Sequence, residues 1–154
     1  MTDDMTAQLD QILTTHSGRE GALLPILHDV QAAFGHVPQV VVPLIAKALN
    51  IAKAEVHGVV TFYHDFREEK AGAHVVKLCR AEACQAVGGD RVAAHAQSML
   101  GVGWHGTTLD GRVTLEPIFC LGLCACGPAA MVDGKLVGRV DEARFDAIVA
   151  GVRA

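Results

Sequence analysis

Apolar positions in residues 1–70 recur at the three- and four-residue spacing of amphipathic helices. The spacing predicts four short helices, at residues 3–15, 21–34, 39–49 and 53–63. Gly35 and Asn50 follow the second and third segments and are expected to end them. Pro43 lies inside the third segment, so that helix is expected either to begin later or to kink. Short turns join the segments, and the pattern predicts a small helical bundle.

The pattern changes after residues 67–73, a charged and glycine-containing stretch that we interpret as a linker. The elements expected beyond it are a strand at 74–78, a helix at 85–100 that Gly88 and Gly89 weaken, hairpins at 107–115 and 130–137, and a helix at 141–152. An Asp-Gly pair, which suits a turn whose two central residues have positive φ, lies at the centre of each hairpin. Asp141 is expected to cap the last helix. The sequence thus predicts an α/β protein with a helical bundle domain at 1–70 and a domain of thioredoxin size at 71–154.

Composition narrows the class of protein. Apolar residues make up 51% of the chain, which favours a surface that is buried against other subunits. The net charge of −4 gives no reason to expect a nucleic acid or an anionic membrane as a partner. The N-terminus is acidic and no apolar signal segment follows it. We therefore expect a cytoplasmic protein with no direct membrane contact.

All five cysteines lie in two short segments of the second half. Cys79 and Cys84 form one close pair, Cys120 and Cys124 form another, and 35 residues stand between the pairs. In the cytoplasm such spacing favours metal ligands or redox groups over disulfides, and an odd number of cysteines points the same way. Two close pairs of thiolates suit a [2Fe–2S] cluster, which takes two thiolates on each iron.

Three other kinds of site compete with this interpretation. Structural zinc accepts four thiolates but favours a Cys-x2-Cys spacing, which neither pair has. A thiol-exchange enzyme would carry a Cys-x-x-Cys motif after its first strand. A Rieske centre needs two histidines near the cysteines, but no histidine lies between Cys79 and Cys84 or beyond Cys120.

The residues between and after the second pair are expected to surround the metal group. Gly122 and Gly127 can let backbone amides turn toward the sulfurs, because glycine has no side chain to clash. Cys126 is expected to be a small apolar neighbour, with a thiol bonded to the cluster or a substitute ligand as the alternative. The chain shows no nucleophile–base pairing and no phosphate-binding loop, so no catalytic residue and no nucleotide site are expected on it.

The cysteine motif resembles that of the small thioredoxin-like [2Fe–2S] subunit that accompanies NADH-oxidising flavoproteins, the family of the 24-kDa subunit of NADH dehydrogenase (complex I). The segments Val56–Tyr63 and Thr107–Leu115 are similar to this family too, so the resemblance covers roughly residues 21–149. It implies a helical N-terminal domain, a thioredoxin-like cluster domain, and a partner subunit that binds FMN and NAD. It also implies four cluster ligands: Cys79, Cys84, Cys120 and Cys124.

Within this family the segment Glu116–Ala129 resembles the gamma subunit of cytoplasmic, NAD-dependent, molybdenum-containing formate dehydrogenase. This resemblance implies an electron-transfer subunit in a complex with a large catalytic subunit that holds molybdenum cofactor and further iron–sulfur clusters. The alternatives within the family are the equivalent small subunits of complex I and of NAD-reducing hydrogenases. The alternative from a different class is a zinc-stabilised scaffold that only assembles other subunits.

Overall fold

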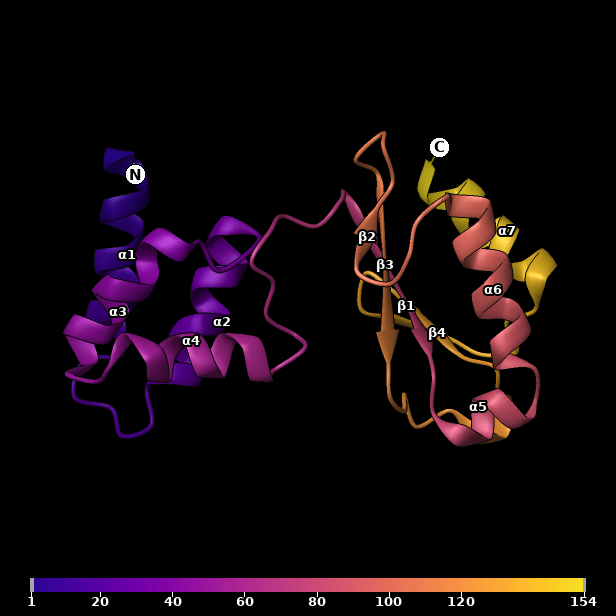
Figure 1. The fold of residues 1–154 in the computed structure, drawn as a ribbon, viewed down its shortest axis with the longest axis horizontal. Helices are drawn as coiled ribbons and strands as arrows, with labels where there is room; N and C mark the ends of the chain where they lie inside the picture. Colours follow the sequence, from indigo (N-terminus) through magenta and orange to yellow (C-terminus); the bar gives the residue numbers. More distant parts are fainter. Residues whose placement is uncertain (1, 154) are drawn as a thin grey trace. The chain divides into compact units, whose positions relative to one another are not determined.

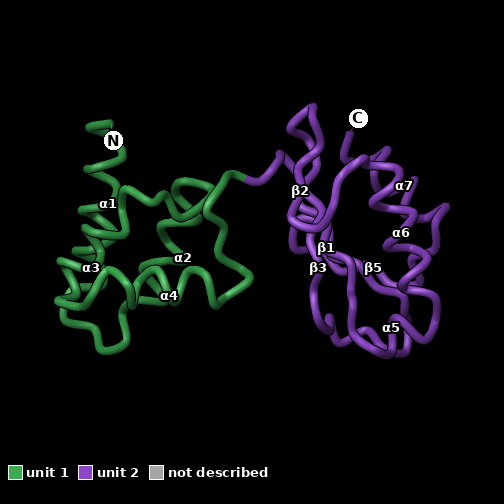
Figure 2. The backbone as a smooth tube through the Cα atoms, viewed as in Figure 1, with its two compact units in different colours: residues 1–70 green, residues 71–154 purple. Residues whose placement is uncertain are grey.

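The computed structural model describes residues 2–153 (Figure 1). The chain divides into two compact units, unit 1 at residues 1–70 and unit 2 at residues 71–154 (Figure 2). Unit 1 is helical, whereas unit 2 combines a five-stranded sheet with helices. The predicted class, α/β with helices first, is therefore confirmed. Within the described residues, no helix is both long enough and apolar enough to cross a membrane.

Unit 1 contains helices close to the predicted ones. They are α1 (Asp3–Thr15), α2 (Leu23–Phe34), the 3-10 turn η1 (Gln39–Val41), α3 (Val42–Leu49) and α4 (Lys53–Phe62). Gly35 and Asn50 end their helices in the left-handed conformation, with φ of 78° and 53°. The third predicted helix begins late, because Pro43 falls in the first turn of α3, where a missing N–H costs nothing. Gly21 has φ of +66°, so α2 begins two residues after the predicted start.

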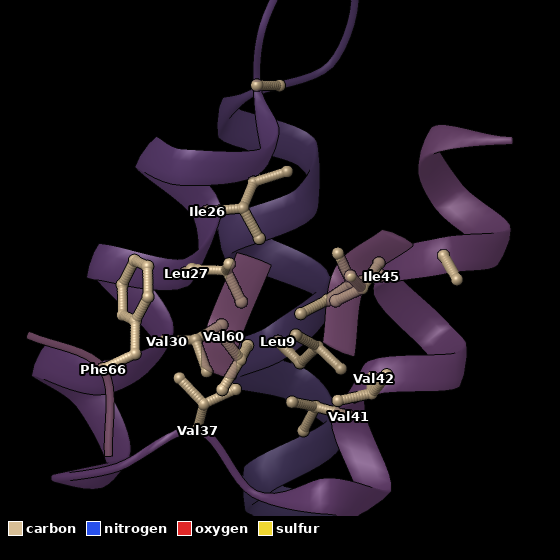
Figure 3. Close-up of a cluster of buried hydrophobic side chains, with 13 residues drawn as sticks. Leu9, Ile26, Leu27, Val30, Val37, Val41, Val42, Ile45, Val60 and Phe66 are labelled. Carbon is tan, nitrogen blue, oxygen red and sulfur yellow. The ribbon is translucent and has the colours of Figure 1, made fainter. Parts of the chain in front are cut away.

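The apolar stripes of these helices meet in one core (Figure 3). Leu27 and Val30 of α2, Ile45 of α3 and Val56 of α4 are all 0% exposed. Each such side chain contributes about 1.5–3 kcal/mol by leaving water. Phe66, beyond α4, closes one side of the core, and its ring centroid lies 4.9 Å from that of His28 with the two rings tilted by 52°. Packing of amphipathic stripes therefore explains why helices this short are stable.

Unit 2 is built on a sheet with strand order β2-β3-β1-β4-β5. The strands are β1 (His74–Cys79), β2 (Gly106–Thr107), β3 (Val113–Ile118), β4 (Ala130–Val132) and β5 (Lys135–Val137). β1 and β3 are parallel, and the other pairings are antiparallel. The helices are α5 (Glu82–Ala86), α6 (Gly89–Leu100) and α7 (Glu142–Arg153). α6 and α7 cover one face of the sheet (Figure 1), where Val76, Leu115 and Phe145 are 0% exposed.

The single helix predicted at residues 85–100 is wrong, because the structure has α5 and α6 there. Gly88 interrupts the helical path with φ of +99°. A Cβ on Gly89 would lie 2.6 Å from the Cys84 carbonyl oxygen, so the two helices meet too closely for any side chain. The break therefore depends on both glycines, which the apolar spacing of the segment did not reveal.

The two Asp-Gly turns differ. Asp133 and Gly134 both have positive φ, 47° and 81°, as predicted for the β4–β5 hairpin. In the turn before β3 only Gly111 has positive φ, at 67°, so the prediction is wrong for Asp110. The Asp110 carboxylate instead accepts hydrogen bonds from the Thr108 hydroxyl and from the Arg112 N–H, which shapes a different turn.

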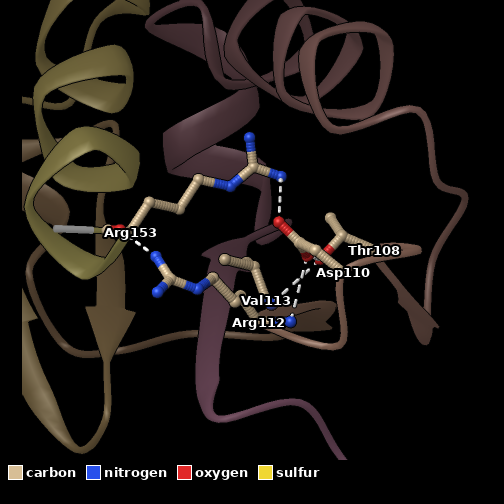
Figure 4. Close-up of polar contacts among 5 residues, drawn as sticks. All are labelled: Thr108, Asp110, Arg112, Val113 and Arg153. Atoms are coloured by element: carbon tan, nitrogen blue, oxygen red, sulfur yellow. Dashed lines mark hydrogen bonds and ion pairs between the residues drawn. The ribbon is translucent and has the colours of Figure 1, made fainter.

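The turn at Asp110 is also tied to the end of α7 (Figure 4). Asp110 Oδ2 lies 3.5 Å from an Nη atom of Arg153. The Arg112 guanidinium donates to the Arg153 carbonyl. These contacts join a surface turn to a helix that packs on the sheet, so they order the C-terminal end of α7.

Replacing Asp110 with Asn should remove a pH-dependent part of the stability of unit 2. The hydrogen bond from Thr108, and then that from the Arg112 N–H, hold the pKa of Asp110 below its usual value of 3.8. A lowered folded pKa stabilises the protein above the unfolded pKa, and this stabilisation is lost as pH falls through the folded value. The Tm difference between parent and Asp110→Asn should therefore shrink from about pH 5 to about pH 2.

Fluorescence of Trp104, the single tryptophan, reports the unfolding of unit 2 in this experiment. Asp10→Asn on the exposed side of α1 is the control, and it should leave the pH profile of the parent unchanged. A Tm difference for Asp110→Asn that stays constant down to about pH 2 would contradict the linkage.

Candidate metal centre

The parallel pairing of β1 with β3 brings two of the predicted cysteines to the same edge of the sheet. Cys79 is the last residue of β1 and is in register with Ile118, the last residue of β3. Cys120 follows Ile118 after one residue. The Cys79 N–H donates to the Ala129 carbonyl at 2.9 Å, which holds the end of β1 against the segment before β4. Segments far apart in the sequence therefore meet where the parallel strands end.

Two short helical elements carry the other predicted ligands. Cys84 lies in α5, and Cys124 begins the 3-10 turn η2 (Cys124–Cys126). The thiols of Cys79 and Cys84 lie close enough to shift each other's pKa, and the Cys120 thiol shifts the pKa of Cys124 in the same way. The Cys124 thiol also interacts electrostatically with the first pair. The structure thus brings all four predicted thiols together as two neighbouring pairs.

This donor set fits a two-iron cluster. The four thiols form two pairs, and a [2Fe–2S] cluster takes two thiolates on each iron. Thiols are also the softest ligands that a protein offers, and soft ligands select iron–sulfur clusters, Cu(I) or zinc.

In the first pair, the pKa of Cys79 is set by burial and by hydrogen bonds, most of them from backbone amides. Burial by itself would raise the pKa of the Cys79 thiol. Hydrogen bonds from the Ala81 amide and the Cys84 thiol outweigh burial and hold the pKa of Cys79 below its usual value. The amides of Leu121 and Cys120 act in the same direction. The Cys79 sulfur is therefore prepared for the ionised form that a metal ligand takes.

The pKa values of Cys84 and Cys124 shift upward, opposite to the shift of Cys79. Burial, and then the hydrogen bond with Cys79, raises the pKa of Cys84. The hydrogen bond with Cys120, followed by the charge of that residue, raises the pKa of Cys124. Four thiolates at such short range repel one another unless positive charge lies between them. The donor set therefore favours a bound metal group over free thiolates.

The two pairs differ in exposure. Cys79 and Cys84 are 4% and 1% exposed, and with Ala129 they form a small buried cluster. The apolar residues packed against this cluster are Ala81, Ile118, Leu121 and Leu123. Cys120 and Cys124 are exposed. Water is thus excluded from one side of the thiol group, while the other side is open to a partner.

The two predicted glycines serve different purposes. Gly122 has φ of +75° and directly follows Leu121, whose amide reaches the buried pair. Gly127 provides space: a Cβ there would lie 3.0 Å from Val87 Cγ2 and 3.5 Å from Cys84 Sγ. Both positions therefore favour glycine, one for its backbone conformation and one for close packing.

The sequence interpretation expected glycines to turn backbone amides toward the sulfurs, but it did not identify the amides themselves. They are the amides of Ala81, Leu121, Ala129 and of Cys120, which is itself a predicted ligand. Ala81 and Leu121 lie within two residues of predicted ligands, so proximity alone could have suggested them. Ala129 reaches Cys84 only because β4 pairs with β1, and no local signal marks it.

The fifth cysteine stands beside this group. Cys126 ends η2 and is half-buried. Its carbonyl accepts a hydrogen bond from the Arg139 N–H at 2.5 Å. Its expected role as a small apolar neighbour stays a prediction.

A sheet covered by helices on one face, with four clustered thiols where its parallel strands end, defines a small α/β protein that holds a metal group through cysteine. The chain belongs to the thioredoxin-like [2Fe–2S] ferredoxin family, whose sequence model matches residues 9–153. This match confirms the predicted family. It also confirms the thioredoxin-like fold with preceding helices and the [2Fe–2S] cluster as the cofactor.

Two curated relatives illustrate the similarity. One is a subunit of the NADH-quinone oxidoreductase of Pseudomonas aeruginosa, which is 38% identical over 119 residues that cover 77% of this chain and 72% of that protein. The other is the HndA subunit of the NADP-reducing hydrogenase of Solidesulfovibrio fructosivorans, which is 31% identical over 140 residues that cover 91% and 82%.

Solved structures show the same fold. A crystal structure of NAD+-reducing [NiFe]-hydrogenase in the air-oxidized state matches with a TM-score of 0.70 at 21% sequence identity. The match covers 86% of this chain and 23% of the hydrogenase chain. At this identity the likeness concerns the fold alone.

The difference in burial predicts an order of thiol modification. Iodoacetamide should alkylate Cys120 and Cys124 of the native iron-free chain before Cys79 and Cys84, because reaction at the buried pair requires local opening. Mass spectrometry of peptides taken at successive times measures the order. The urea-unfolded chain is the control, in which the order should disappear. Equal rates in the native chain would contradict the burial described for this site.

Proposed function

We propose that Cys79, Cys84, Cys120 and Cys124 hold one [2Fe–2S] cluster and that the chain is an electron-transfer subunit of an NAD-linked oxidoreductase complex. The observation that carries the proposal is the meeting of two thiol pairs where β1 and β3 end. Family membership supports the same cofactor.

The chain's own residues provide ligands, positive potential and exclusion of water. The four thiolates bind the irons, and the bound cluster supplies one-electron redox chemistry. The amides of Ala81 and Leu121 direct positive dipoles at the Cys79 sulfur, which offsets the negative charge that the site gathers. Leu121 and Leu123 keep water from the buried pair. Such contacts set the reduction potential of the bound group.

The exposed pair indicates where electrons enter or leave. Cys120 and Cys124 face the surface, and Phe119, 69% exposed, lies beside them. No charged residue occurs in the segment from Ile118 to Val132. A partner protein with an apolar contact surface suits this edge, and electron exchange requires no acid, base or nucleophile from this chain.

Replacing a ligand should abolish the cluster. Each of Cys79→Ala, Cys84→Ala, Cys120→Ala and Cys124→Ala is expected to lose visible absorption and most of its iron after anaerobic expression, because one iron would keep a single thiolate. Cys126→Ala is the matched control and should keep both. Iron analysis, zinc analysis and the EPR spectrum of the reduced protein measure the result.

These measurements also decide between rival sites. A colourless parent chain with one zinc ion would replace the proposal with the scaffold alternative. Loss of iron from Cys126→Ala together with retention in Cys124→Ala would move the fourth ligand to Cys126.

For the parent complex we infer an NADH-oxidising assembly of the NADH-quinone oxidoreductase or NAD(P)-reducing hydrogenase kind, in the cytoplasm, where thiols stay reduced. The names of the two curated relatives support this choice over formate dehydrogenase. The neighbouring partner is a subunit that binds FMN and NAD. Formate dehydrogenase is the second candidate, supported by the resemblance of Glu116–Ala129 with its Cys126. It would add a large subunit with molybdenum cofactor and further iron–sulfur clusters.

Purification of the complex tests the parent assembly. The tagged full-length chain should co-purify from its native cells with FMN and with NADH oxidation activity. Reduction of NAD(P) by hydrogen would identify a hydrogenase, and reduction of a quinone by NADH would identify the quinone-linked enzyme. Molybdenum together with formate-dependent NAD reduction would establish the second candidate. Recovery of the chain without any flavoprotein would contradict both.

A further inference from the structure

The segment Gly138–Val140, called the strap here, lies directly against η2. It follows β5 and precedes α7. The Arg139 N–H donates to the Cys126 carbonyl at 2.5 Å, and the Val140 N–H donates to the Pro128 carbonyl at 2.8 Å. Two backbone hydrogen bonds therefore join the strap to the loop that begins with Cys124.

Gly138 brings the two backbones into close contact. A Cβ on Gly138 would lie 2.9 Å from Cys126 Cβ and 2.9 Å from the Cys126 carbonyl oxygen. Real side chains essentially never approach this closely, and one of the two contacted atoms belongs to the backbone. A larger residue at position 138 would therefore have to move η2 or the strap itself.

The strap cannot move easily because both of its ends are anchored. Val140 is 0% exposed and packs in the core between the sheet and its helices. Asp141 follows it and caps α7, where its carboxylate accepts from the Arg144 N–H at 2.7 Å. On the other side, β5 pairs with β4. A rigid strap transmits a change at position 138 to η2.

The loop on the other side of the contact depends on such support. Cys120 has φ of +81°, a left-handed conformation that residues with a Cβ rarely adopt. Cys124 is exposed and lies in a turn of three residues. Neither residue is in a strand or an α-helix, so their shared geometry must be set by neighbouring contacts.

We propose that Gly138 is a positioning residue, through which the strap holds η2 so that the Cys124 thiol stays paired with Cys120. In this role the backbone carbonyl and the Cβ of Cys126 contact the strap. The Cys126 sulfur is not a ligand. The proposal rests on the proposed function, because it assumes that Cys124 binds the cluster.

Gly138→Ala tests this role. The added methyl group should displace η2 and increase the rate of cluster loss to a chelator about tenfold, the lower end of what supporting contacts around a metal site contribute. The EPR g-values of the reduced protein should also shift, because the geometry at the exposed pair changes. Gly103→Ala is the matched control: it lies in unit 2, and a Cβ there meets nothing within 4 Å. It should leave the loss rate and the spectrum unchanged.

A double variant separates positioning from general stability. Cys126→Gly removes the Cβ that the new methyl group would meet, whereas the carbonyl contact remains. Cys126→Gly combined with Gly138→Ala should therefore recover part of the cluster retention. The Tm of the iron-free chain, read from Trp104, should change far less than cluster retention does. If Gly138→Ala fails to fold, the double variant is compared with Cys126→Gly alone by the same measurements.

Three outcomes would overturn the inference. The first is a Gly138→Ala protein with the parent's spectrum and loss rate. The second is a double variant that is no better than Gly138→Ala. The third is an iron-free Tm that falls in proportion to cluster loss, which would show a purely structural role. A parent chain that binds no iron would defeat the proposed function instead, so the two failures can be told apart.

Discussion

The parallel register of β1 and β3 is the constraint on which the rest of unit 2 depends. It aligns Cys79 with Ile118 and so delivers Cys120 to the same edge. A slip of one residue would turn every side chain of β1 to the opposite face, and a slip of two would move the thiols apart by about 6.6 Å. The register is maintained by burial, because Val76 and Val113 must face α6 and α7. Hydrophobic packing thus determines where the thiols meet.

Close backbone packing completes the site. A Cβ on Gly89 or on Gly138 would lie less than 3.0 Å from atoms of Cys84 or Cys126, and a Cβ on Gly127 would lie 3.0 Å from Val87 Cγ2. Because these glycines have no Cβ, the backbones of α5, η2 and the strap can lie close together. Arg80, which follows Cys79, lies 2.7 Å from Asp90, and this ion pair balances its charge. Backbone amides supply positive potential toward the sulfurs at short range in a partly dry environment.

Much of the fold was predictable because its elements follow local rules. Helical spacing identified α1 and α4, and Gly35 and Asn50 marked helix ends, since these depend on residues close in sequence. The hairpin at Asp133 followed from its turn chemistry. The failures occurred where backbone conformation and side-chain hydrogen bonds, which apolar spacing does not display, decide the local structure. The break before α6 depends on the close approach of Gly89 to the Cys84 carbonyl, and the turn at Asp110 depends on the hydrogen bonds that its carboxylate accepts from Thr108 and Arg112.

The sequence by itself determined the family, the four candidate thiols and their grouping into pairs, because cysteine spacing is a local property that the chain displays directly. Only the tertiary structure decided which thiols are buried, which amides reach them and which segment supports η2. Ala129 and Gly138 come to the site through the pairing of β4 with β1 and with β5. Residues that meet through strand pairing leave no periodic trace in the sequence, since the contact is made by backbone groups that every residue carries.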